Sequence, residues 1–190
     1  AEVVYDSELS SDIQAFHEKE LEFKEFGSKA KSIKENNCEI VDFKAFANSL
    51  ECNMVNRRLY PLQLLSAYHL AFSQNACNFS VPGAGKTSIV YGAYTYLKNL
   101  PESSNKKIDK IIIIGPLSAF GPWELEYQEC FGRPATCKRI NGALSTESKK
   151  QYFYGDTAEV ILISYASVVS IKESLKYFLK NNRVMVVLDE

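Results

Sequence analysis

The chain has few of the residues that bind metal ions or form disulfides. It contains only two histidines, and its five cysteines are odd in number and include no C-x-x-C pair. Such a set favours reduced thiols inside a cell over a disulfide framework. Because His17 and His69 are far apart in the sequence, it also argues against a zinc site. We therefore expect an intracellular protein, cytoplasmic or, in a eukaryote, nuclear.

Long apolar runs and a strong net charge are missing as well. No apolar run approaches the roughly 18 residues of a membrane helix and no signal-peptide pattern is present, so we expect no membrane span. The formal net charge of −1 gives the chain no general attraction to nucleic acid. The charge is uneven, however, because residues 1–59 hold 12 acidic and 8 basic residues, whereas residues 60–190 hold 11 and 14. The second segment is mildly basic, which permits contacts with phosphates.

The pattern of apolar residues changes near residue 59. Before residue 59 the apolar residues recur only at helical spacing. After it, segments with helical spacing alternate with short apolar runs of β-type residues. That alternation predicts an α/β fold, a parallel sheet with helices on both faces. We expect a helical N-terminal extension over residues 1–58 and a nucleotide-binding domain over residues 59–190. The predicted helices are 11–34, 42–50, 62–72, 122–131, 145–153 and 168–179, and the predicted strands are 110–114, 136–140, 159–163 and 184–188.

Three of these elements carry more specific expectations. The helix over 11–34 has one apolar stripe, and we expect it to pack on its own domain, with a coiled-coil partner as the weaker alternative. Pro122 suits the first turn of the helix over 122–131. The continuous apolar run at 184–188 is typical of a strand that is covered on both faces.

A glycine-rich segment precedes one more apolar helical pattern, which begins near residue 86. It reads Ser80-Val-Pro-Gly-Ala-Gly-Lys-Thr87 and matches the phosphate-binding pattern G-x-x-x-x-G-K-[ST] except at Ser80. Gly83 and Gly85 would let backbone amides approach phosphate oxygens. Lys86 would reach the β- and γ-phosphates, and the Thr87 hydroxyl would bind Mg²⁺. The alternative is an ordinary glycine-rich turn before a helix.

Two carboxylates follow the last predicted strand. Asp189 and Glu190 come directly after the run at 184–188, at the strand end where open α/β sheets bind their ligands. Asp189 would hold Mg²⁺ through water, and Glu190 would orient or deprotonate an attacking water. The alternative is two solvated acids in a turn. The loop and these acids together predict a nucleoside triphosphatase.

Four segments in the same order make the chain resemble the N-terminal RecA-like lobe of a superfamily 2 helicase, in the Swi/Snf-related subgroup. The resemblance covers about residues 59–190 and implies that the predicted nucleotide-binding domain is a partial RecA-like lobe. The segments are Leu59-Tyr-Pro-Leu-Gln63, which precedes the loop, Pro116-Leu-Ser-Ala-Phe-Gly-Pro-Trp-Glu-Leu-Glu126, Glu159-Val-Ile-Leu-Ile-Ser-Tyr165 and Val186-Val-Leu-Asp-Glu190.

The resemblance implies a role for each matching position. Gln63 would read the adenine of ATP, and the segments after two strands would contact the phosphates of nucleic acid. Trp123 is expected in the core rather than on a base. The predicted nucleotide-binding residues are Gln63, Pro82, Gly83, Ala84, Gly85, Lys86, Thr87 and Ser88. The predicted catalytic residues are Lys86, Asp189 and Glu190, the Mg²⁺ ligands are Thr87 and Asp189, and the nucleic-acid candidates are Pro116, Leu117, Ser118, Ser164 and Tyr165.

The resemblance also implies a larger machine. In that family a second RecA-like lobe supplies an arginine that stabilises the transition state, and a further strand lies between the strand of the loop and the strand that ends at the acids. We therefore expect these residues to form part of a motor that tracks duplex DNA without sequence preference. Two alternatives remain, namely a degenerate scaffold without ATPase activity and an ATPase of the same superfamily that acts on RNA.

Overall fold

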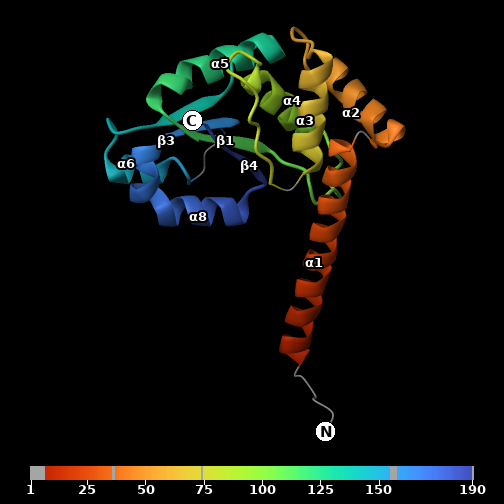
Figure 1. Cartoon of the computed structure of the whole chain (residues 1–190). Coiled ribbons are helices and arrows are strands. Elements are labelled where there is room, and N and C mark those ends of the chain that lie inside the picture. The colour runs from red at the N-terminus through yellow and green to blue at the C-terminus, as the bar shows by residue number, and fades with distance from the viewer. Residues whose placement is uncertain (1–6, 36, 74, 155–157, 190) are drawn as a thin grey trace.

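The protein has an α/β fold built on one parallel sheet. The computed structural model describes residues 7–35, 37–73, 75–154 and 158–189. In these ranges the four strands lie in the order β2-β3-β1-β4, and all neighbouring pairs are parallel (Figure 1). The α/β fold class predicted from the alternation of elements is therefore confirmed. The strands are β1 Lys110–Gly115, β2 Cys137–Ile140, β3 Val160–Ser164 and β4 Val184–Leu188.

The isoleucine-rich strand β1 lies inside the sheet and separates two cores. Successive side chains of a strand point to opposite faces. Ile111 and Ile113 accordingly belong to the core formed with α2 to α5, whereas Ile112 and Ile114 belong to the core formed with α8. A strand buried on both faces needs no polar alternation, which explains its continuous apolar sequence.

Helices cover both faces of the sheet, as expected. One layer contains α2 to α5, and the other contains α6 and α8 (Figure 1). None of the helices in the described ranges combines the length and the apolarity that crossing a membrane requires. The helices are α1 Ser7–Lys34, α2 Ile40–Asn53, α3 Pro61–Phe72, α4 Lys86–Lys98, α5 Leu117–Phe131, α6 Thr146–Gln151, α7 Tyr165–Val168, the 3-10 helix η1 Val169–Ile171 and α8 Lys172–Asn181.

Helix α5 begins five residues earlier than the sequence pattern predicted. It starts at Leu117, after Pro116, so Pro122 lies inside the helix and the expectation that it occupies the first turn is wrong. A proline inside a helix removes the hydrogen bond to the carbonyl four residues before it. Here that carbonyl belongs to Ser118, which is exposed, so water can replace the missing donor.

The helix predicted over 168–179 is divided into three pieces. Helix α7 and η1 precede α8, and Ile171 has φ −116° and ψ 9°, which are not α-helical values. Ile171 is buried in the second core. Tertiary packing at this residue therefore interrupts a segment that is helical by its local pattern.

Strand β4 is less buried than its sequence predicted. It pairs with β1 on one side and ends the described sheet on the other. Val186 is 45% exposed and Leu188 is 72% exposed. The prediction of a strand covered on both faces is therefore wrong for most of β4, because on the face that carries Val184, Val186 and Leu188 only Val184 packs against a core in the described residues.

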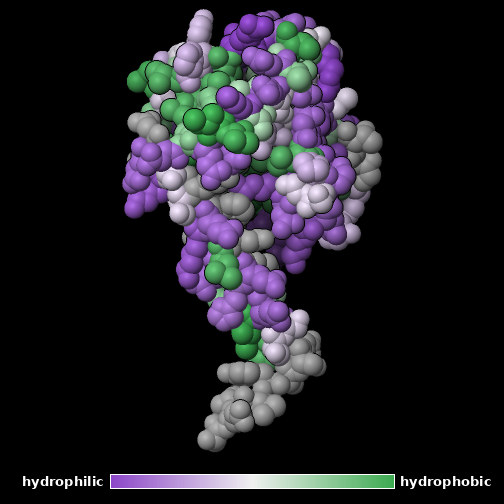
Figure 2. Space-filling view, turned by 90° about the vertical axis from the view of Figure 1, so that its right-hand side faces the viewer, coloured by the Kyte–Doolittle hydropathy of each residue, from purple (hydrophilic) through white to green (hydrophobic). Residues whose placement is uncertain are grey.

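Helix α1 projects from the body instead of packing along it (Figure 1). Its C-terminal end lies beside α3, where Ile33 is buried (Figure 1), whereas among the described side chains Leu9, Ile13 and Phe16 are exposed. Figure 2 shows polar and apolar side chains side by side along the projecting part. The expectation that this helix packs on its own domain is therefore wrong for most of its length. The stripe side chains Phe23, Phe26 and Ala30 lie outside the described side chains.

Helix α2 packs closely on the body. Phe46 and Leu50 of α2 belong to the same core as α3 and α4. The Phe46 ring lies against Tyr68 and Tyr96, with ring centroids 5.4 and 5.1 Å apart. The domain boundary between residues 58 and 59 stays a prediction.

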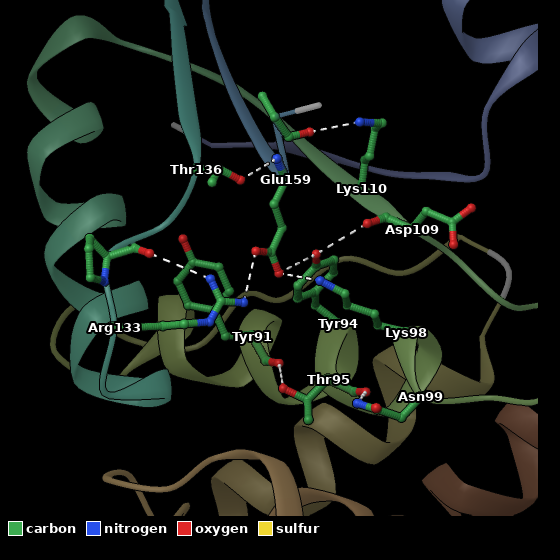
Figure 3. A network of polar contacts seen from close by, with 12 residues as sticks. Tyr91, Tyr94, Thr95, Lys98, Asn99, Asp109, Lys110, Arg133, Thr136 and Glu159 are labelled. Carbon is green, nitrogen blue, oxygen red and sulfur yellow. Dashed lines mark hydrogen bonds and ion pairs between the residues drawn. The ribbon is translucent and has the colours of Figure 1, made fainter. Parts of the chain in front are cut away.

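A buried carboxylate joins several elements at the amino ends of the strands (Figure 3). Glu159, which is 12% exposed, precedes β3 and forms ion pairs with Lys98 of α4 and with Arg133, whose Nη2 lies 3.0 Å away. The Tyr94 hydroxyl donates to the same carboxylate at 3.1 Å. Burial alone would raise the pKa of Glu159, but hydrogen bonds from Lys98 and Arg133 lower it to about 2. This network holds α4 and the segment after α5 against the sheet.

Candidate nucleotide-binding site

The segment at residues 80–87 forms a loop directly before α4. Gly83 and Gly85 have φ of +83° and +79°, values that other residues rarely adopt. The Ala84 amide donates to the Val81 carbonyl at 3.1 Å and closes a turn. Helix α4 begins at Lys86 as expected, so the amides of its first turn, which have no partner within a helix, are directed toward the loop. These features fit the predicted phosphate-binding role.

Gln63 connects the start of α3 to this loop. Its side-chain Nε2 donates to the Ala84 carbonyl at 2.9 Å, and its Oε1 accepts from the Tyr60 amide at 3.0 Å. A Cβ atom at Gly85 would lie only 2.5 Å from this Nε2, so a larger residue would have to displace the Gln63 amide as well as adopt the positive φ. The predicted contact between Gln63 and adenine stays a prediction, but Gln63 is half-buried and lies beside the loop.

Ser80 is held in place by its own hydrogen bonds. Its amide and hydroxyl both donate to Oδ1 of Asn78, the amide at 3.1 Å. Its carbonyl accepts from the Lys86 ammonium at 2.7 Å. The loop therefore brings Lys86 back over its own first residue. Pro82 and Lys86 are exposed, and Thr87 is half-buried.

Ser88 is tied to a carboxylate behind the loop. Its buried hydroxyl donates to Oε1 of Glu126 on α5, and Arg57 donates to the same oxygen from Nη2 at 2.6 Å and from Nε at 3.0 Å. The Cys130 thiol lies close to this carboxylate, and burial together with the negative charge of Glu126 raises its pKa to about 12. Because its hydroxyl is engaged, Ser88 would contribute its backbone amide to a phosphate.

Asp189 lies at the carboxyl end of β4 and is held from three directions. Its amide donates to the Ile114 carbonyl at 2.8 Å, and its own carbonyl accepts from the Tyr165 hydroxyl. Its carboxylate Oδ2 accepts from Nε1 of Trp123 at 2.7 Å. A Cβ atom at Gly115 would lie 3.3 Å from the Asp189 backbone and Cβ, so glycine allows this close approach. Glu190 lies outside the described residues.

Helix α5 brings the two halves of the predicted site together. Trp123 and Glu126 are three residues apart and therefore neighbours on the surface of one helix. Trp123 donates to Asp189, whereas Glu126 accepts from Ser88 at the start of α4. The acid after β4 and the first turn of α4 are thus both anchored to a single turn of α5.

The nucleic-acid candidates lie at the same edge of the sheet, after neighbouring strands. Leu117 and Ser118 are exposed at the start of α5, directly after β1. Ser164 is buried and its hydroxyl donates to Ser167 at 2.9 Å. Tyr165 is half exposed, and its hydroxyl reaches the Asp189 carbonyl. The contacts of these residues with nucleic acid stay predictions.

The sequence did not reveal that Trp123, Glu126 and Tyr165 form hydrogen bonds with other residues of the candidate site. Trp123 was expected in the core, and its 3% exposure and edge-on contact with Tyr91 confirm this. Three hydrogen bonds were not predicted. Trp123 donates to Asp189, Ser88 donates to Glu126, and Tyr165 donates to the Asp189 carbonyl. The sequence places Trp123 and Glu126 on one face of a helix, but this spacing does not identify the residues that they contact.

Comparisons with known proteins give a distant likeness. No protein-family model matches the chain, and no curated protein matches it. A structure that resembles it is the Sulfolobus solfataricus SWI2/SNF2 ATPase core in complex with double-stranded DNA, with 17% sequence identity and a TM-score of 0.48. The match covers 73% of this chain and 33% of that chain, so the chain spans about a third of that structure's length. The likeness is one of fold.

Proposed function

We propose that this chain is the ATP-binding half of an ATP-dependent DNA translocase of the helicase type. The observation that carries the proposal is the joint anchoring of Asp189 and the start of α4 on one turn of α5. It ties a carboxylate at a strand end, and the first turn of the helix that follows a glycine loop, to the same turn of α5. Nucleoside triphosphatases need both parts, one for the phosphates and one for the metal ion.

Each residue has a role that follows from its position. The amides of Gly83 to Thr87 and the Lys86 ammonium would bind the phosphates, and Gln63 would contact the base. The Lys86 ammonium would leave the Ser80 carbonyl to do so. Thr87 and Asp189 would hold Mg²⁺, which neutralises the developing phosphate charge. Glu190 would orient the attacking water. Hydrolysis would also require a second RecA-like lobe, so we expect these residues alone to bind ATP weakly with negligible turnover.

Replacing Lys86 tests ATP binding directly. Lys86 is exposed, and within the described ranges its ammonium bonds to the Ser80 carbonyl, so Lys86→Ala should leave the fold intact. Titration calorimetry with Mg²⁺ and ATP should show at least a tenfold loss of affinity in this variant. Lys172→Ala, which alters an exposed lysine of α8, should bind like the unaltered chain. Equal affinity of Lys86→Ala and the unaltered chain would contradict the proposal.

The nucleic-acid part of the proposal has its own test. Ser118 lies exposed in the first turn of α5, where an added carboxylate is compatible with the helix but repels phosphates. Binding of labelled duplex DNA of mixed sequence should weaken in Ser118→Glu and not in Ser10→Glu, on the projecting helix α1. Binding should also fall as salt rises. Tighter binding of duplex RNA than of DNA would support the RNA-directed alternative instead.

One observation favours a second candidate, a scaffold without ATPase activity. Ser80 replaces the first glycine of the pattern, and residues 75–81 before the turn form no strand. If neither ATP nor ADP binds to the unaltered chain in the presence of Mg²⁺, the scaffold is favoured. Nucleotide binding that depends on Lys86 favours the ATP-binding role over a scaffold that binds no nucleotide.

A further inference from the structure

We propose that Trp123 is a positioning residue for Asp189, setting the orientation of the carboxylate that would bind Mg²⁺. The proposal rests on the proposed function, because it assumes that Asp189 serves the nucleotide site. A buried tryptophan needs a hydrogen-bond acceptor for its indole N–H. Here the acceptor is not a backbone carbonyl of the core but the carboxylate of a residue at the sheet edge, 66 positions further along the chain.

Trp123 is itself held firmly. Its side chain is buried, and its ring packs edge-on against Tyr91 with centroids 5.3 Å apart. The Tyr91 hydroxyl donates to the backbone carbonyl of Trp123 at 2.8 Å. The ring and the backbone are therefore both fixed by α4, and the direction of the indole N–H is fixed with them.

This geometry gives the two carboxylate oxygens of Asp189 different partners. Oδ2 of Asp189 accepts from the indole at 2.7 Å, within the range of N–H···O hydrogen bonds. The described residues offer no hydrogen-bond donor to Oδ1, which is thus left for a metal-bound water. Partners that orient a metal-binding carboxylate in this way commonly change metal affinity by 10- to 100-fold when they are removed.

The backbone of Asp189 is anchored independently of Trp123. Its amide bonds to the Ile114 carbonyl, and its carbonyl accepts from Tyr165. Loss of the indole N–H would therefore free the carboxylate to rotate without displacing the residue. A role for Trp123 limited to packing predicts a loss of stability only, whereas a positioning role predicts a change in the dependence on Mg²⁺.

The contact can be observed without any ligand, because Trp123 is the only tryptophan of the chain. Its emission under selective excitation reports the environment of one indole. Asp189→Asn replaces the charged acceptor by a neutral amide, so the emission maximum of this variant should shift from that of the unaltered chain. An identical emission spectrum in a folded Asp189→Asn variant overturns the contact and the proposal with it.

The positioning role is tested by Trp123→Phe, which keeps an aromatic ring beside Tyr91 and removes the N–H. Affinity for a non-hydrolysable ATP analogue is measured by calorimetry with and without Mg²⁺, and folding by circular dichroism. Without Mg²⁺, Trp123→Phe should bind the analogue with the affinity of the unaltered chain. The increase in affinity on adding Mg²⁺ should be at least tenfold smaller in the variant. Tyr127→Phe, a conservative change in the same aromatic cluster, should keep the full gain.

The outcomes separate the two proposals. If Trp123→Phe gains as much affinity from Mg²⁺ as the unaltered chain does, the positioning role is wrong and the proposed ATP site stands. If the unaltered chain does not bind the analogue at all, the proposed function fails, and the positioning role that rests on it fails too. If Trp123→Phe does not fold, the test rests on the emission of Asp189→Asn. A shifted maximum supports the contact between Trp123 and Asp189, and an unchanged spectrum overturns the proposal.

Discussion

The Glu159 network makes a quantitative prediction about stability. Its pKa falls from 4.5 to about 2 in the folded protein, and each unit corresponds to about 1.4 kcal/mol. A depressed pKa contributes stability above the unfolded value, and this is lost as the pH falls through the folded value. The full shift is worth about 3 kcal/mol at neutral pH, which screening of the partly exposed cations Lys98 and Arg133 reduces to about 2 kcal/mol.

Glu159→Gln should therefore lower the free energy of unfolding by about 2 kcal/mol at pH 7 and by roughly 1 kcal/mol near pH 3. Urea unfolding followed by circular dichroism at both pH values measures this difference. Glu129→Gln, an exposed change on α5, should alter stability by less than about 0.5 kcal/mol at either pH. A loss in Glu159→Gln that is equal at pH 7 and pH 3 would refute the assignment of the pKa shift to this carboxyl.

Two glycine substitutions test close approaches in the core and in the loop. Gly92→Ala places a Cβ atom 2.8 Å from the Leu59 side chain and 3.0 Å from the Ala67 Cβ of α3 and should cost about 1–3 kcal/mol in urea unfolding by overpacking the contact of α4 with these residues; an unchanged midpoint would contradict that packing. Gly85→Ala combines a positive φ with a 2.5 Å approach to Gln63, so it should lose more stability and more ATP affinity than Gly83→Ala, which has a positive φ but no atom nearby. Equal effects of these two variants would show that the contact with Gln63 does not matter.

Much of the fold could be predicted because the elements follow local patterns. The continuous isoleucine run of β1 and the helical spacing of apolar residues after Lys86 are both local signals, and both elements form where expected. Gly83 and Gly85 both have positive φ, which fits the expectation that they give the loop its unusual backbone path. Errors appeared where packing decides the outcome. Pro122 is tolerated inside α5, and helix α1 extends away from the body despite its apolar stripe.

The sequence by itself determined the order of helices and strands, the glycine loop and the acid at the end of β4, because each depends on neighbours within a few residues. Only the tertiary structure decided that Gln63 lies beside the loop, that β4 lies at the edge of the described sheet, and that Trp123 reaches Asp189. These contacts join residues 21 and 66 positions apart. They depend on how α3 and α5 pack against α4 and the sheet, and no local periodicity records that arrangement.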